Sequence, residues 1–131
     1  MKKFIYYLNL SLILFAVMAT LTGCDDDEDS IDRSQFVGTY SVAENCDGQT
    51  DAYTMTVSTS SSDDNGILID NLFDVGGEIT ATVSGSNITI PQQTVDGVAY
   101  NGSGSISGNV LTINFNVEFL FSFSCTATAT K

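Results

Sequence analysis

Apolar and polar residues alternate with a period of two along much of the chain. The segments 53–58 and 79–84 show this most clearly, with threonine and serine at the polar positions. Their apolar positions are Tyr53, Met55, Val57, Ile79, Ala81 and Val83. This period is typical of β-strands that bury one face. Beyond residue 34, no window of about eleven residues has the apolar spacing of an amphipathic helix. The pattern therefore predicts an all-β domain.

Turn-forming residues separate the alternating segments at spacings near ten residues. They are Asp63-Asp64-Asn65-Gly66, Gly76-Gly77, Gly85-Ser86-Asn87, Asp96-Gly97 and Gly108-Asn109. Gly and Asn supply the positive φ angles of tight hairpin turns, and regular spacing of this kind predicts an antiparallel meander. We expect about eight strands, covering residues 36–43, 52–60, 66–72, 77–84, 86–91, 97–106, 109–116 and 119–128.

The last part of the chain keeps its apolar residues on one parity for longer than a single strand can explain. These residues are Leu111, Ile113, Phe115, Val117, Phe119, Phe121, Phe123 and Cys125. One strand of this length would measure about 50 Å, which is excessive for a small domain. A hairpin with a two-residue loop would reverse the inward parity. We therefore expect an odd-numbered loop or a bulge around Asn116–Phe119.

The N-terminus has the layout of a secretory signal. Lys2 and Lys3 precede the apolar run Leu8–Leu21, and small residues follow it. The run of about fourteen residues is short for a membrane-spanning helix, which needs roughly twenty. We expect cleavage after Gly23, and a retained membrane anchor is the alternative.

The residues at this boundary, Leu21-Thr22-Gly23-Cys24, resemble the bacterial lipobox. The resemblance implies that Cys24 becomes the first residue of the mature chain and carries acyl chains such as palmitate. Two or three acyl chains anchor a protein stably, whereas one chain does not. The membrane is thus the first expected partner, through the lipid anchor at Cys24.

Five consecutive acidic residues, Asp25–Asp29, follow the cysteine. They resemble the export signal of lipoproteins from Bacteroides-type bacteria, which implies a position on the outer face of the outer membrane. A calcium loop fits less well, because such loops space their ligands at alternate positions. A self-repelling spacer is the alternative. Asp29-Ser30-Ile31 resembles the O-glycan attachment site of the same bacteria, which makes Ser30 a candidate for glycosylation, with a plain polar tether as the alternative.

Export bears on the two remaining cysteines, Cys46 and Cys125. Oxidising compartments favour disulfides, so we expect these two residues to pair and to join the first strand region to the last. Two free buried thiols are the alternative. The chain has no histidine and no CxxC spacing, and nothing in it supports a zinc site. Pairing of the first strand with the last would close the sheet into a barrel and remove its exposed edges.

The charge balance argues against nucleic-acid partners. The full chain has a formal charge of −12. Once residues 1–23 are removed, Arg33 and Lys131 are the only basic residues, against sixteen acidic ones. Contacts to phosphate need Lys and Arg, so we expect no binding to nucleic acid.

Three short motifs resemble small single-domain Bacteroides-type surface lipoproteins with lipocalin-like β-barrels. They are Phe36-Val37-Gly38-Thr39-Tyr40, Ile67-Leu68-Ile69-Asp70-Asn71-Leu72-Phe73 and Ile88-Thr89-Ile90-Pro91-Gln92-Gln93. The resemblance implies a lipocalin-like barrel and no particular activity. We expect a signal peptide over residues 1–23, an acidic tether over 24–34 and the barrel over 35–131.

The sequence does not favour an enzyme. Without histidine, Ser-His and Cys-His nucleophiles are excluded, and no P-loop or dinucleotide-binding glycine pattern is present. We expect no cofactor, no metal and no catalytic residue.

A non-catalytic binding module is the preferred interpretation, since a barrel of eight strands can hold one small ligand. The candidate residues for lining a small apolar site are Tyr40, Tyr53, Met55, Tyr100, Phe115, Phe121 and Phe123. The inward glycines Gly102 and Gly104 leave room for a ligand or for a bulky neighbour. Alternatively, the aromatic residues fill the core, and the protein contacts other proteins or glycans through its loops.

Overall fold

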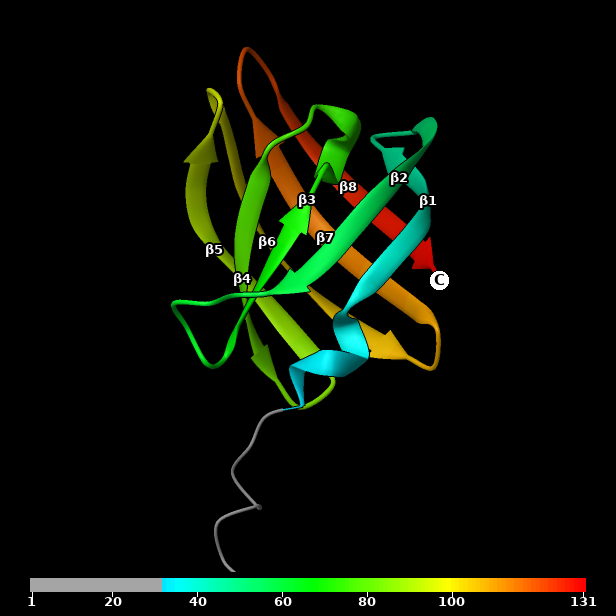
Figure 1. Cartoon of the computed structure of the whole chain (residues 1–131). Coiled ribbons are helices and arrows are strands. Elements are labelled where there is room, and N and C mark those ends of the chain that lie inside the picture. The colour runs from blue at the N-terminus through cyan, green and yellow to red at the C-terminus, as the bar shows by residue number, and fades with distance from the viewer. Residues whose placement is uncertain (1–31) are drawn as a thin grey trace, which may run out of the picture. The chain divides into compact units, whose positions relative to one another are not determined.

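The computed structural model describes residues 32–131, which form a closed antiparallel barrel of eight strands in sequential order (Figure 1). This confirms the all-β meander and its closure. The elements are η1 (Arg33–Phe36), β1 (Gly38–Cys46), β2 (Gln49–Thr59), β3 (Gly66–Asp70), η2 (Leu72–Asp74), β4 (Glu78–Ser84), β5 (Asn87–Val95), β6 (Val98–Ser107), β7 (Val110–Glu118) and β8 (Ser122–Thr130). The signal, Cys24, the acidic run and Ser30 lie outside the described residues.

The barrel closes where β1 pairs with β8. The ladder runs from Ser41 opposite Thr130 to Cys46 opposite Cys125. Every strand therefore has two hydrogen-bonded neighbours, and the described chain has no open sheet edge. No helix within residues 32–131 has the length and apolar character needed to cross a membrane.

The turn between β7 and β8 is a three-residue loop, Phe119-Leu120-Phe121, flanked by the pair Glu118 and Ser122. The expected odd-numbered loop is present, but the expected position around Asn116–Phe119 was wrong, because β7 continues through Glu118. Phe119 and Phe121 have odd residue numbers, as the inward-facing residues of β7 and β8 do, but this does not place them on the inward face. Inside the loop they leave the ladder, and Phe121 is 70 % exposed.

Strand β5 also differs from expectation, since it runs to Val95 rather than ending near Pro91. Proline cannot donate a ladder hydrogen bond, and the β5–β6 register shifts between Ile90 and Gln93 to accommodate it. At this point the side chain of Gln93, instead of the backbone of β5, bonds to the backbone of β4. It accepts a hydrogen bond from the amide of Thr80 at 2.9 Å and donates one to the Thr80 carbonyl at 2.8 Å.

Large side chains fill most of the barrel interior. Those exposed by 2 % or less include Phe36, Tyr40, Met55, Tyr100 and Phe115. The Tyr40 hydroxyl donates to the carbonyl of Phe36 at 2.7 Å, which satisfies this polar group within the core. Four of the candidate ligand-lining residues, Tyr40, Met55, Tyr100 and Phe115, are therefore packed core residues.

The inward glycines of β6 serve the packing of β6 against β7. A Cβ atom on Gly102 would lie 2.3 Å from the Asn114 carbonyl oxygen, and one on Gly104 would lie 2.6 Å from that of Thr112. Of the two expectations for these glycines, the bulky neighbour is the one observed, because a Cβ on Gly102 would also meet Phe115 at 2.7 Å. They therefore serve the close contact of β6 with β7.

One end of the barrel is sealed by the N-terminal segment. Phe36, at the end of η1, is fully buried, and the Arg33 guanidinium donates to the carbonyls of Ser60, Asp63 and Gly66 at 2.9–3.0 Å. Lys131 donates to the carbonyls of Gln35 and Val37 at 2.6 and 3.1 Å. Arg33 and Ser34, which the sequence analysis assigned to the tether, thus belong to η1.

The opposite end carries the β1–β2, β5–β6 and β7–β8 turns and the η2 segment, because the odd-numbered strands of a meander all end on the same side. Figure 1 shows η1 at one end of the barrel and the β7–β8 loop at the other. We call the end with η2 and the β7–β8 loop the mouth.

Candidate ligand site at the barrel mouth

A cavity of about 230 Å³ opens at the mouth. It is lined by Glu44, Cys46, Gln49, Thr50, Asp51, Phe73 and Phe123. These residues come from β1, β2, η2 and β8, so the site exists only because the barrel closes. Its volume lies somewhat below the roughly 300 Å³ at which drug-sized pockets begin. It therefore has room for a small molecule or for one end of a larger one.

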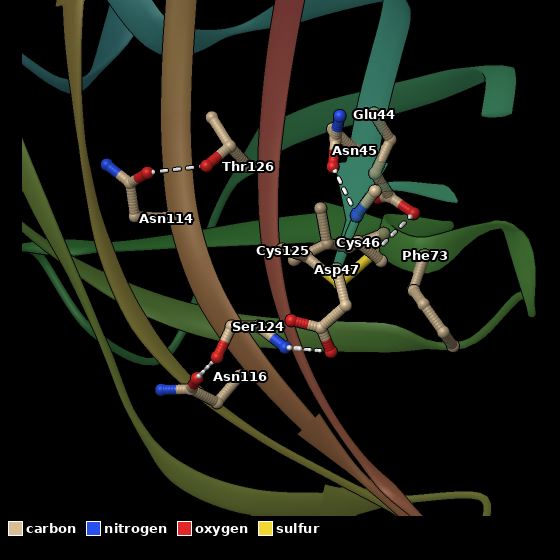
Figure 2. The surroundings of a disulfide bond; sticks show 12 residues. Glu44, Asn45, Cys46, Asp47, Phe73, Asn114, Asn116, Ser124, Cys125 and Thr126 are labelled. Atoms are coloured by element: carbon tan, nitrogen blue, oxygen red, sulfur yellow. Dashed lines mark hydrogen bonds between the residues drawn. A yellow bond between two sulfur atoms is a disulfide. The ribbon is translucent and has the colours of Figure 1, made fainter. Parts of the chain in front are cut away.

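The Cys46–Cys125 disulfide forms part of the cavity wall and confirms the expected pairing. The two residues are direct partners in the β1–β8 ladder, with their Cα atoms 4.1 Å apart. Figure 2 shows the bond between the two strands, with the side chain of Glu44 beside it.

Glu44 is the one buried charged side chain within residues 32–131, with 5 % of its surface exposed. The alternation of β1 puts it on the inward face with Tyr40, Val42 and Cys46. Its Oε2 accepts a hydrogen bond from the hydroxyl of Tyr53, and the Tyr53 oxygen accepts one from the amide of Phe73 at 3.0 Å. One polar chain thus joins β1, β2 and η2.

The second carboxyl oxygen of Glu44 has a different environment. Oε1 lies 3.4 Å from Sγ of Cys46, the contact drawn as a dashed line in Figure 2. A disulfide sulfur carries no proton, so this contact is a hydrogen bond only when Glu44 is protonated and donates to sulfur. When Glu44 is ionised, no residue of the described chain donates to Oε1.

Burial raises the pKa of Glu44, and the nearby charges of Asp51 and Asp74 raise it further, while the hydrogen bond from Tyr53 opposes them. Burial also raises the pKa of Tyr53, with the hydrogen bond to Glu44 acting in the same direction. Tyr53 therefore remains a hydroxyl donor, while the carboxyl group of Glu44 can change its charge.

An aromatic cluster forms the apolar side of the mouth. The ring centroid of Phe73 lies 6.2 Å from that of Phe123 and 6.4 Å from that of Phe119, and Phe119 stacks on Phe123 at 5.8 Å. These distances are typical of stabilising aromatic pairs.

The η2 segment presents Phe73 through an unusual backbone. Asn71, Phe73 and Asp74 have φ angles of 67°, 68° and 52°, a conformation that costs free energy for non-glycine residues. The Asn71 side chain holds the segment, because it donates to the carbonyl of Thr54 and accepts from the amide of Gly76, both at 2.8 Å.

The mouth is acidic. The turns and strand ends around it carry Asp47, Asp51, Asp74, Asp96 and Glu118. Both basic side chains of residues 32–131, Arg33 and Lys131, bind carbonyls at the sealed end instead. A negative field therefore surrounds the cavity without a local counter-charge from the described chain.

Ligand atoms of Glu44, Cys46 and Cys125 lie within 4.8 Å of one another, which is close enough to hold a metal ion. However, metals bind cysteine as the thiolate, and both sulfurs are engaged in the disulfide. In the oxidised protein this group offers one carboxylate. The arrangement is suited to binding a hydrogen-bond donor or a cation.

A second depression, of about 240 Å³, lies on the outer face over β6, β7 and β8. Its amide side chains form a continuous ladder, in which Asn101 donates to Gln92, Asn116 to Asn101 and the Ser124 hydroxyl to Asn116, at 2.9–3.2 Å. These groups largely satisfy one another. The amide groups of this depression are therefore already paired with one another.

The structure separates the candidate lining residues into three groups. Tyr53 and Phe123 lie at the mouth, Tyr40, Met55, Tyr100 and Phe115 lie in the core, and Phe121 lies at an exposed loop tip. Sequence reasoning missed Glu44, Asp51 and Phe73. For Glu44 the signal was its parity, which it shares with Tyr40, Val42 and Cys46.

Comparison of the chain with models of known protein families, with curated proteins and with solved structures gives no match. The fold and the mouth therefore have to be interpreted on their own chemistry.

Proposed function

We propose that this chain is a surface lipoprotein, anchored in the outer membrane through acylated Cys24. Its barrel then acts as a non-catalytic binding module for a small, largely apolar ligand at the mouth. The N-terminal features that support the anchor are the basic-apolar signal, the lipobox-like Leu21-Thr22-Gly23-Cys24 and the acidic run behind it.

The observation that carries the binding role is the composition of the mouth cavity. It combines an aromatic wall, Phe73 and Phe123, with a buried carboxyl group, Glu44. Binding sites for small molecules are typically apolar hollows with a few well-placed polar groups. Because the interior below is filled with side chains, the ligand sits at the mouth and not inside the barrel.

The position of the mouth fits a tethered binding module. The described chain begins at Asp32, next to η1 and the sealed end (Figure 1), while the residues that line the cavity lie at the opposite end. The mouth is thus the end of the barrel farther from the first described residue.

A neutral aromatic probe tests the binding role. With the full chain purified in nonionic detergent, titration with 2-phenylethanol should shift the amide NMR signals of Phe73, Phe123 and Tyr53. Ser41 and Thr56, exposed positions of β1 and β2 away from the cavity, serve as internal controls and should not shift. Absence of shifts at the mouth up to the solubility limit would contradict a small-ligand site there.

Intact-mass spectrometry of the protein from its own host tests the anchor and the glycan. The expected mass is that of a chain starting at Cys24 with two or three acyl chains, and Cys24→Ala should abolish this mass. An additional hexose-containing mass that disappears in Ser30→Ala would support glycosylation. An unprocessed chain without acyl groups would contradict the lipoprotein assignment.

Protease shaving of whole cells tests surface export. Replacement of all five residues Asp25–Asp29 by alanine should protect the barrel from added protease while preserving acylation. Unchanged exposure would reduce the acidic run to a spacer.

The alternative role is that of an interaction protein that contacts other proteins or glycans through its loops. The exposed apolar loop between β7 and β8 favours it, with Leu120 and Phe121 exposed by 85 % and 70 %. Cross-linking on intact cells should then capture a partner in wild type and lose it in Leu120→Asp, with 2-phenylethanol binding unchanged.

A further inference from the structure

We infer that the mouth recognises a protonated amine carried on an apolar or aromatic body. The ammonium group lies against Oε1 of Glu44, and the apolar body lies against Phe73 and Phe123. This inference rests on the proposed binding role and specifies the chemical class of the ligand.

The carboxyl group of Glu44 has hydrogen-bonding capacity that the described chain does not satisfy. Glu44 lines the cavity, and only 5 % of its surface is exposed to solvent. Oε2 has a donor in Tyr53, whereas Oε1 faces a disulfide sulfur that cannot donate. A buried carboxylate oxygen without a donor is costly, and a ligand that brings N–H groups to it removes that cost.

The charge around Glu44 is negative. Asp51 on β2 and Asp74 on η2 lie close enough to Glu44 to disfavour its ionisation. Within residues 32–131 neither basic side chain is available at the mouth, because Arg33 and Lys131 bind carbonyls at the sealed end. The field therefore attracts cations and repels carboxylate or phosphate ligands.

An aromatic wall borders the same cavity as the carboxyl group. Phe73 and Phe123 lie 6.2 Å apart between ring centroids and both border the cavity. Aromatic faces attract ammonium groups and pack well against apolar bodies. A cavity of about 230 Å³ suits a small arylalkyl or alkyl amine, or the amine-bearing end of a longer molecule.

Neutral and inorganic ligands fit the mouth less well. An alcohol can donate to Oε1, but it does not compensate the negative field of Asp51 and Asp74. A metal ion would find one buried carboxylate, because both sulfurs of the group are held in the disulfide.

A pair of isosteric probes tests the inference. The full chain in nonionic detergent is titrated with 2-phenylethylamine and with 2-phenylethanol at neutral pH, and binding is followed by amide NMR at Phe73 and Phe123. The amine should bind at least about tenfold more tightly than the alcohol, because hydrogen bonds to charged groups are the stronger ones.

Two variants locate the selectivity. Glu44→Gln should reduce this preference to about twofold or less, since the carboxamide keeps the size of the side chain but not its charge. Glu118→Gln, which removes one exposed charge at the same end, should retain most of the preference. The dispersion of the amide NMR signals shows that Glu44→Gln is folded.

Acidification provides an independent readout. The titratable groups close to Glu44 are Tyr53 and Asp51 from β2, Asp74 from η2 and Tyr100 from β6, while the disulfide that joins β1 to β8 does not titrate. As pH falls and Glu44 takes up a proton, amine binding should weaken while alcohol binding persists.

The outcomes separate the two claims. Equal binding of amine and alcohol, or an amine preference that survives Glu44→Gln, would overturn the inference and leave the binding module intact. Absence of binding by both probes would overturn the binding module itself, and the inference with it.

Discussion

The hydroxyl of Tyr53 joins the carboxyl group of Glu44 to the backbone of η2. It donates to Oε2 of Glu44 and accepts from the amide of Phe73 at 3.0 Å. This one hydroxyl thus positions both the carboxyl group of Glu44 and the segment η2, which carries Phe73.

Removal of this hydroxyl should destabilise the mouth. Tyr53→Phe leaves the Phe73 amide and Glu44 without their partner, and we expect a loss of about 1–3 kcal/mol in the free energy of unfolding. Urea denaturation measures this loss, and amide exchange at Phe73 should accelerate. Tyr100→Phe is the matched control, because the Tyr100 hydroxyl makes only a long contact of 3.5 Å to the Leu72 carbonyl. Equal losses in the two variants would refute the assigned role of Tyr53.

Glu44 should make stability depend on pH in a direction opposite to that of most carboxylates. Its pKa in the folded state lies above the ordinary value of 4.5. Between these two pKa values the folded chain holds a proton that the unfolded chain has lost, so the free energy of unfolding falls as pH rises through this window. Above the folded-state pKa of Glu44, its contribution to the free energy of unfolding changes no further.

Glu44→Gln should abolish this fall and be more stable than wild type at neutral pH. Chemical denaturation of the full chain at a series of pH values gives the difference between the two proteins. If that difference stays constant from acidic to neutral pH, Glu44 does not carry a raised pKa.

The disulfide should supply a large part of the stability of the closed barrel. Cys46 and Cys125 are separated by 79 positions in the sequence, and the loop-entropy relation gives about 4–5 kcal/mol for a loop of this size. Cys46→Ala/Cys125→Ala should lower the free energy of unfolding by an amount of this order. A reductant should destabilise wild type similarly and leave the double variant unchanged. Insensitivity of wild type to a reductant that breaks the bond would contradict this prediction.

The close approach of β6 and β7 should not tolerate a methyl group. In Gly102→Ala the new Cβ would lie 2.3 Å from the Asn114 carbonyl oxygen and 2.7 Å from Cα of Phe115. Relief requires the strands to move apart, so we expect a loss of about 1–3 kcal/mol in urea denaturation. Ser103→Ala, on the exposed face of the same strand, should stay close to wild type. A stable Gly102→Ala would show that the interior has free space.

The sequence predicted the barrel because alternation and turn residues agree along the whole domain. Segments such as 79–84 alternate strictly and end in glycine-containing turns, and a paired cysteine at each end of the sheet indicated where it closes. The position of the β7–β8 loop was predicted wrongly because Phe119 and Phe121 continue the period of the flanking strands. Periodicity cannot distinguish a loop aromatic residue from an inward one.

The mouth was less predictable than the fold. Its residues are far apart in sequence, and their proximity depends on strand register, which brings Cys125 opposite Cys46 and Glu44 opposite Asp51. Phe73 enters the site through a left-handed backbone that no local pattern indicates. A charged residue on an inward parity, Glu44, was the one available signal.

The central claim is that the open mouth, and not the filled interior, holds a small ligand. Native mass spectrometry of the chain from its own host tests this most directly, in wild type and in Gln49→Trp, which places a large ring in the cavity. We expect a bound small molecule in wild type that is absent from Gln49→Trp while the barrel remains folded. A bare barrel in wild type, or the same bound mass in both proteins, would contradict the claim.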